Sequence, residues 1–235
     1  MGRAFEYRKA RKMARWGKMS RIFPRISKEI TMATKAGGPD PENNSRLRVA
    51  IQNAKGALMP KDRVEAAIKR ATNKDEKDYE EVVYEGYGPH GVAIVVETAT
   101  DNPTRTVANV RHLFSKYGGS MGTTGSLSFL FERKGIFRIK AEGLSLEDLE
   151  LELIDYGAED VRAEDDEVVV MAAFADFGQM QKALETRGLP VISSELQRIP
   201  LSFTELSEAQ EEEAMKLIEF LEEDEDVQNV FHNLA

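Results

Sequence analysis

The spacing of apolar residues changes after residue 77, and this change constrains the fold more than any other feature. Before it, apolar side chains recur every three to four residues, as in 22–33 and 64–71, which is the period of a helix that packs on one face. After it, short apolar runs bounded by glycine, as in 82–86 and 92–98, are typical of strands. The sequence therefore predicts an all-helical region followed by mixed α/β structure.

Residues 135–199 show a strand–helix–strand–strand–helix–strand order. The predicted helices begin at Ser145 and Phe177, and the predicted strands are 136–139, 160–163, 168–174 and 191–199. This is the order of the ferredoxin-like fold, a two-layer antiparallel sandwich.

The residues before 135 supply only part of a second layer: two strands, a helix starting at Asn102, and a third strand predicted at 127–131. A strand candidate at 201–203 and an acidic helix from Ser207 would complete it, with 226–234 as a last helical turn. The predicted fold class is therefore α+β, an N-terminal all-helical domain plus two α/β sandwich domains. The predicted domains are 1–77, a discontinuous 78–134 with 200–235, and the ferredoxin-like 135–199 inserted into it.

Charged residues divide at the same place as the apolar period. The chain carries 32 Lys and Arg and 41 Asp and Glu, a formal net charge of −9. Residues 1–77 contain 20 basic and 8 acidic residues, a net charge of +12, whereas residues 78–235 contain 12 and 33, a net charge of −21. Phosphate backbones attract clustered Lys and Arg, so this asymmetry predicts that the helical domain contacts nucleic acid.

The basic side chains are densest near the start of the chain, where several share one face of a predicted helix. Residues expected to contact the phosphate backbone are Arg3, Arg8, Lys9, Arg11, Lys12, Arg15, Lys18, Arg21, Arg25 and Lys28. None of them stands out as reading base edges. The alternative is that these residues form a solvated face, or pair with the acidic helix predicted after Ser207.

A glycine-rich stretch at 118–126 is the one phosphate-like motif. It follows a predicted helix and leads into a predicted strand, so it matches neither the Walker nor the dinucleotide-binding pattern. Its glycines also suit an ordinary turn with positive φ. As a second site of contact with nucleic acid we name Gly119, Gly122, Thr123, Thr124, Gly125 and Ser126.

Residue types that support catalysis or metal binding are scarce or scattered. Cysteine is absent, which excludes disulfides, thiolate zinc sites and cysteine nucleophiles. The histidines at 90, 112 and 232 lie far apart, and the carboxylates cluster on predicted helix surfaces. We therefore expect no enzyme activity, no metal, no cofactor and no small-molecule substrate.

Apolar runs are too short for a membrane span, and the first eight residues lack the apolar stretch of a signal peptide. We therefore expect a cytoplasmic protein without a membrane partner.

Three groups of motifs resemble the YebC/PmpR family, in the same order along nearly the whole chain. They are Gly37-Gly38-Pro39-Asp40-Pro41 with Asn44-Ser45-Arg46-Leu47-Arg48, Tyr84-Glu85-Gly86-Tyr87-Gly88-Pro89, and Thr100-Asp101-Asn102 with Gly122-Thr123-Thr124-Gly125-Ser126. Many members begin with Gly-His-Ser-Lys-Trp where this chain has Gly2-Arg3-Ala4-Phe5-Glu6, so no role of that histidine or tryptophan is carried over. The resemblance implies three domains, the third inserted in the second.

The resemblance also implies a non-enzymatic protein. Family members are described as DNA-binding transcriptional regulators, and others, including mitochondrial translational activators, as ribosome-associated factors. Our leading hypothesis is a non-catalytic, cytoplasmic, nucleic-acid-binding regulator, and the family resemblance favours a DNA-binding transcriptional regulator. The alternatives are a translation factor that contacts ribosomal RNA, and an adaptor whose acidic domains bind a basic protein.

Overall fold

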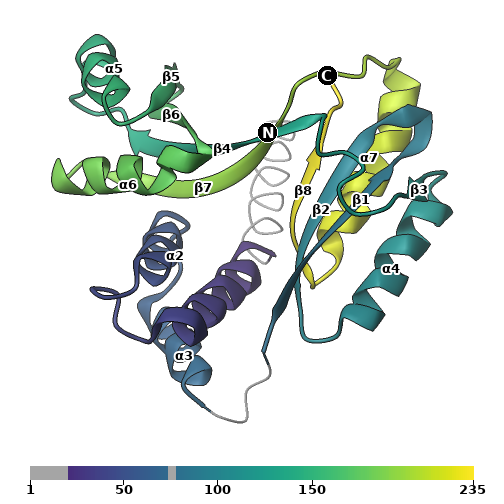
Figure 1. Ribbon diagram of the computed structural model, residues 1–235, viewed down its shortest axis with the longest axis horizontal. Coiled ribbons are helices and arrows are strands. Elements are labelled where there is room, and N and C mark those ends of the chain that lie inside the picture. The colour runs from purple at the N-terminus through teal and green to yellow at the C-terminus, as the bar shows by residue number, and fades with distance from the viewer. Residues whose placement is uncertain (1–20, 74–77) are drawn as a thin grey trace, which may run out of the picture. The chain divides into compact units, whose positions relative to one another are not determined.

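The computed structural model describes residues 21–73 and 78–235. The chain forms two compact units that divide after Asp78 (Figure 1). Within the described residues, no helix combines the length and apolar character needed to cross a membrane.

The first unit is helical throughout its described part, as predicted. Its helices cover residues 21–37, α2 (Ser45–Gly56) and α3 (Lys61–Ala71). Their apolar faces meet in one core that includes Ile30, Leu47 and Ala67, all fully buried. The charged side chains therefore lie on the outer faces of the helices.

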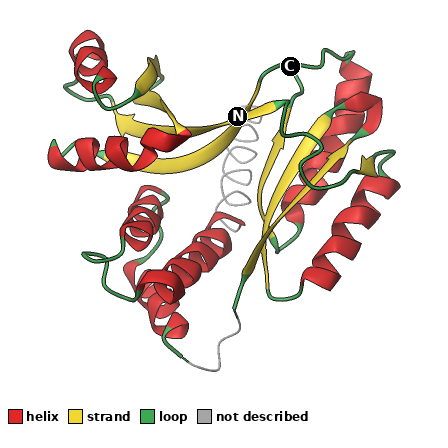
Figure 2. Ribbon diagram, viewed as in Figure 1, coloured by secondary structure: helices red, strands yellow, loops and turns green. Residues whose placement is uncertain are grey.

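The first sheet of the second unit is antiparallel, with strand order β3-β1-β2-β8. Figure 2 draws the strands of both sheets in yellow. Its strands are β1 (Glu80–Tyr87), β2 (Ala93–Thr100), β3 (Ser120–Met121) and β8 (Val227–His232). A short 3-10 turn, Pro89–Gly91, joins β1 to β2. Helices α4 (Pro103–Lys116) and α7 (Glu208–Glu223) pack on one face of this sheet through a shared apolar core.

The second sheet is also antiparallel and has the order β5-β6-β4-β7. Its elements are β4 (Phe131–Lys140), α5 (Leu146–Ile154), β5 (Ala158–Glu164), β6 (Glu167–Ala173), α6 (Phe177–Thr186) and β7 (Val191–Pro200), with a 3-10 turn at Phe174–Asp176. The ferredoxin-like order predicted from the sequence is confirmed. All of these elements lie between β3 and β8 in the sequence, so the chain leaves the first sheet and later returns to it.

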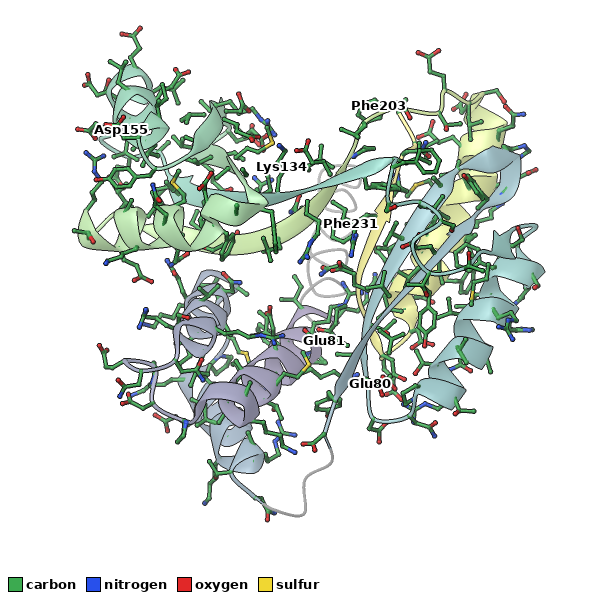
Figure 3. The ribbon with its side chains drawn as sticks, viewed as in Figure 1. Glu80, Glu81, Lys134, Asp155, Phe203 and Phe231 are labelled. Carbon is green, nitrogen blue, oxygen red and sulfur yellow. The ribbon has the colours of Figure 1, made fainter. Side chains whose placement is uncertain are left out.

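Three local predictions in the second unit are wrong. Residues 127–131 do not form a strand: a hydrogen-bonded turn occupies 124–130, and β4 begins only at Phe131. The 201–203 segment makes no strand either, and Phe203 there is 64% exposed (Figure 3). Residues 226–234 contain β8 instead of a helical turn.

Two of these errors, at 127–131 and at 226–234, have a physical cause in the structure. The strand was predicted at 127–131 because Leu127, Phe129 and Phe131 alternate with other residues. Leu127 and Phe131 are buried in one cluster, but Phe129 between them is 67% exposed, so the three side chains do not share a buried face as they would in a strand. In β8 the pairing with β2 shifts between Glu97 and Thr98, which leaves an extra residue in β8. Val227 and Val230 therefore both face the core at a spacing that resembles a helix.

Candidate nucleic-acid interface

The first described helix carries three of the predicted contact residues in one row. Arg21, Arg25 and Lys28 follow helical spacing, and this row lies about 150° around the helix from the buried row of Ile26 and Ile30. The remaining predicted residues lie outside the described ranges; they are Arg3, Arg8, Lys9, Arg11, Lys12, Arg15 and Lys18. Contact of either group with nucleic acid stays a prediction.

The structure adds basic residues that the sequence prediction missed. The exposed basic residues of α2 and α3 are Arg46, Lys55, Lys61, Arg63, Lys69 and Arg70. Lys61 lies 3.5 Å from Glu65, and the Arg63 guanidinium lies 5.8 Å from the centre of the Phe23 ring. These residues do not follow one another in the sequence, so no run of basic residues marks them. Those on α3 could have been predicted from their positions on the helix faces away from the buried Val64, Ala67 and Ala71.

The glycine and asparagine motif before α2 builds a turn. The Asn44 side chain donates to the carbonyl oxygens of Ala33, at 2.7 Å, and Gly38, at 2.8 Å, and accepts from the Leu47 amide at 3.0 Å. Gly38 has φ +88°, and a Cβ on Gly37 would lie within 3 Å of the Asn44 side chain. These residues therefore hold the end of the first helix against the start of α2 and leave Arg46 exposed.

The glycine-rich loop is held by a carboxylate from β1. Buried Glu85 accepts hydrogen bonds from the backbone amides of Gly125, at 3.0 Å, and Leu127, at 2.6 Å, and its carbonyl accepts from the Gly122 amide at 2.8 Å. A Cβ on Gly86 would lie 2.5 Å from the Ser120 carbonyl oxygen, so glycine is required there for β3 to pair with β1. The two motifs, far apart in sequence, thus form one structure.

This arrangement changes how the loop can act. Three amides that a phosphate cradle would need, those of Gly122, Gly125 and Leu127, already donate to Glu85. What the loop presents outward is the exposed stretch 122–125, with the Thr123 and Thr124 side chains. Its role in nucleic-acid contact stays a prediction, based on those hydroxyls and not on a ring of free amides.

The third motif fixes the start of α4. Buried Asp226 accepts from the Thr100 and Thr106 hydroxyls, at 3.2 and 2.9 Å, and from Arg105 at 2.7 Å. Arg105 also lies 3.0 Å from Asp101, and the hydrogen bond to Asp226 raises the pKa of the Arg105 guanidinium further above its ordinary value. Arg105 therefore has a structural role: it holds the start of α4 to Asp226, next to β8.

Comparisons with known proteins assign the chain. The model of the TACO1/YebC protein N-terminal domain matches residues 3–74, and that of the TACO1/YebC second and third domain matches residues 79–234. The chain belongs to the TACO1/YebC family. The family resemblance found in the sequence is thereby confirmed.

Relatives in this TACO1/YebC family match along their whole length. A probable transcriptional regulatory protein of Parabacteroides distasonis is 62% identical over 235 residues, covering 100% of this chain and 97% of that protein. One of Myxococcus xanthus is 53% identical and covers all of both chains. The crystal structure of a conserved hypothetical protein from Aquifex aeolicus has a TM-score of 0.80 and 39% identity, over 92% of this chain and 90% of that one.

In this TACO1/YebC chain, the face of the second sheet that α5 and α6 do not cover carries paired charges. Arg138 lies 3.1 Å from Glu164 and 3.3 Å from Glu167, and Arg162 lies 2.8 Å from Glu164 and 2.7 Å from Asp160. Hydrogen bonds from Arg162 and Arg138 lower the pKa of Glu164. Ferredoxin-like sheets that bind RNA stack bases on exposed aromatic rings. This face instead pairs its cations internally, so it is a poor nucleic-acid platform.

A cavity of about 580 Å³ opens beside the β5–β6 hairpin. Its lining includes Lys140 with Glu142, Asp165, Asp166 and Glu167, so its charge opposes phosphate. Among the described residues no group of three or more His, Asp and Glu is placed to hold a metal ion. The basic helical unit is therefore the best candidate interface.

Proposed function

We propose that this chain is a non-enzymatic, cytoplasmic, nucleic-acid-binding regulator of transcription, with the basic helical unit as its main phosphate-contacting surface. The observation that carries the proposal is the separation of charge: the net charge is +12 in residues 1–77 and −21 in the rest, and the two compact units divide one residue later, after Asp78. A phosphate backbone is attracted to the first unit and repelled by most of the second. The names of the relatives, probable transcriptional regulatory proteins, support the transcriptional role.

Charge reversal in the basic unit tests this proposal. The full chain carrying Arg8→Glu, Arg15→Glu and Lys18→Glu is compared with the unaltered chain by fluorescence anisotropy, using a labelled duplex DNA and a single-stranded RNA of the same sequence. Because three phosphate contacts are lost, the Kd should rise about a hundredfold or more at low salt.

A matched control separates local contacts from overall charge. The second compact unit, Tyr79–Ala235, is called the acidic unit below. Lys140, Lys182 and Lys216 are exposed lysines of this unit, and changing all three to Glu alters the net charge by the same amount. The control should bind nearly as well as the unaltered chain. Equal affinity of the basic-unit variant and the unaltered chain at low salt contradicts the proposal.

The kind of target separates this proposal from the alternatives. Crosslinking in cells, followed by identification of the bound nucleic acid, should recover promoter DNA. Recovery of ribosomal RNA, with sedimentation alongside ribosomal subunits, would instead identify a translation factor. Recovery of neither, with binding to basic proteins, would identify an adaptor.

A further inference from the structure

Helix α4 is the exception in the acidic unit. Its sequence, residues 103–116, contains two arginines, a lysine and a histidine, and no Asp or Glu. The neighbouring α7 carries seven glutamates and a single lysine. The two helices cover the same face of one sheet, so their opposite composition is not required by the packing.

The basic residues of α4 differ in what they contact. Arg105 is engaged by Asp101 and Asp226, and the Lys116 ammonium lies 5.1 Å from the Tyr117 ring centre and 5.6 Å from that of Phe220. Arg111 is exposed and forms no ion pair with any residue in the described ranges. Unlike Arg105 and Lys116, Arg111 therefore makes no ionic or cation–π contact within the described residues.

The position of Arg111 separates it from the acidic helix. Asn109 donates to Asp224 at 3.4 Å and Lys116 lies over Phe220, so these two residues mark the side of α4 that faces α7. At about 100° per residue, Arg111 lies about 160° from Asn109 and about 140° from Lys116 around the helix. Its side chain thus leaves α4 on the flank away from the glutamates of α7.

The end of α4 leads directly to the glycine-rich loop. The Gly119 amide donates to the Phe114 carbonyl at 2.8 Å and the Tyr117 amide to that of Leu113 at 3.1 Å, so the last carbonyls of the helix already have partners. After the two residues of β3, Ser120 and Met121, the chain enters the loop that Glu85 holds, with 122–125 exposed. Arg111 therefore precedes the exposed loop by eleven residues, through the last turn of α4 and the edge strand β3.

We propose that Arg111 and the exposed 122–125 segment form a second phosphate-contacting surface, for the same nucleic acid that the basic unit binds. This inference rests on the proposed function. Arg111 supplies the charge, and the Thr123 and Thr124 hydroxyls supply neutral hydrogen bonds to phosphate oxygens. Because the surrounding unit repels phosphate, a contact confined to this segment fixes which part of the acidic unit faces the nucleic acid.

The test compares two single charge reversals in the full chain. Arg111→Glu removes the proposed contact, and Lys182→Glu, at an exposed lysine of α6, makes the same change in net charge elsewhere in the unit. Affinity is measured by anisotropy across a salt series, with whichever of the duplex DNA and single-stranded RNA probes the unaltered chain binds more tightly. Arg111→Glu should raise the Kd about tenfold and lower the slope of log K against log salt by about one. Lys182→Glu should change neither by a comparable amount.

The outcomes separate the two proposals. If the triple variant of the basic unit loses binding but Arg111→Glu matches Lys182→Glu, the second surface is wrong and the proposed function stands. If the unaltered chain binds neither probe, both are overturned. Circular dichroism and a thermal melt confirm that Arg111→Glu is folded, and Arg111→Gln, which removes the charge without reversing it, should give a smaller effect of the same sign.

Discussion

The two four-stranded sheets of the acidic unit are alike on one face and different on the other. Each buries one face beneath two helices. The second face of the β1 sheet is covered by the chain itself, through Leu127 and Phe131 and the loop held by Glu85. The second face of the β4 sheet is covered by ion pairs around Arg138 and Arg162. Burial of apolar side chains stabilises a fold far more than exposed ion pairs do. Mutations on the second face of the β1 sheet should therefore lower stability more than mutations on the second face of the β4 sheet.

Removing the apolar cover should have the largest effect. Leu127 is fully buried against Ala93, Val95 and Phe131, so Leu127→Ala leaves a cavity and should lower the free energy of unfolding by about 2–5 kcal/mol. Phe129→Ala, at an exposed position two residues away, is the control and should change it by less than about 0.5 kcal/mol. Denaturant unfolding measures both, and equal effects would refute the account of this face.

Releasing the loop should have an intermediate effect. Glu85→Gln keeps the size of the side chain but turns one acceptor into a donor that faces a backbone amide of the loop. The free energy of unfolding should fall by about 1–3 kcal/mol. Hydrogen exchange should show faster exchange of the Gly125 and Leu127 amides. Protection unchanged at both amides would show that the carboxylate does not hold the loop.

The same contrast shows what the sequence can predict. The order of elements in the ferredoxin-like sandwich was readable because alternation, Ser145 as a helix cap and glycine stops agree locally. The strand β8 was not readable, because its bulge puts Val227 and Val230 on one face at a helical spacing. The bulge depends on pairing with β2, more than a hundred residues earlier in the chain.

The candidate sites show the same contrast between features that local sequence determines and features that depend on residues far apart in the chain. The charge separation is a property of composition, so the basic unit was predictable from residue counts. The structure of the glycine-rich loop was not, because Glu85 lies forty residues before Gly125 and nothing local marks it as the partner. Arg111 was missed because its significance depends on which side of α4 faces α7, and only the contacts of Asn109 and Lys116 reveal that side.

Removing an ion pair from the second face of the β4 sheet should lower stability least, and the pH dependence of that loss shows whether charge is its cause. Arg162 is half exposed and pairs with Asp160 and Glu164 on the edge strand β5, so Arg162→Ala should lower the midpoint of unfolding at pH 7 by less than Glu85→Gln does. The pKa of Glu164 is lowered in the folded protein, chiefly by its hydrogen bond from Arg162. The stability from this pair is therefore present above the ordinary glutamate pKa of about 4.3 and is lost as the pH falls through the lower folded value.

Arg162→Ala should accordingly reduce the loss of stability on acidification below pH about 4.3, relative to the unaltered chain. High salt at pH 7 should narrow the difference between the two proteins, because screening weakens exposed pairs first. Leu127→Ala, whose effect is apolar, should keep its full difference in high salt. Val169, on β6, is the buried cross-strand partner of Arg162. If Arg162→Ala lowered stability as much as Leu127→Ala and the loss were insensitive to salt, Arg162 would be acting through the packing of its aliphatic stem and not through its charge. The two faces would then be stabilised by the same force.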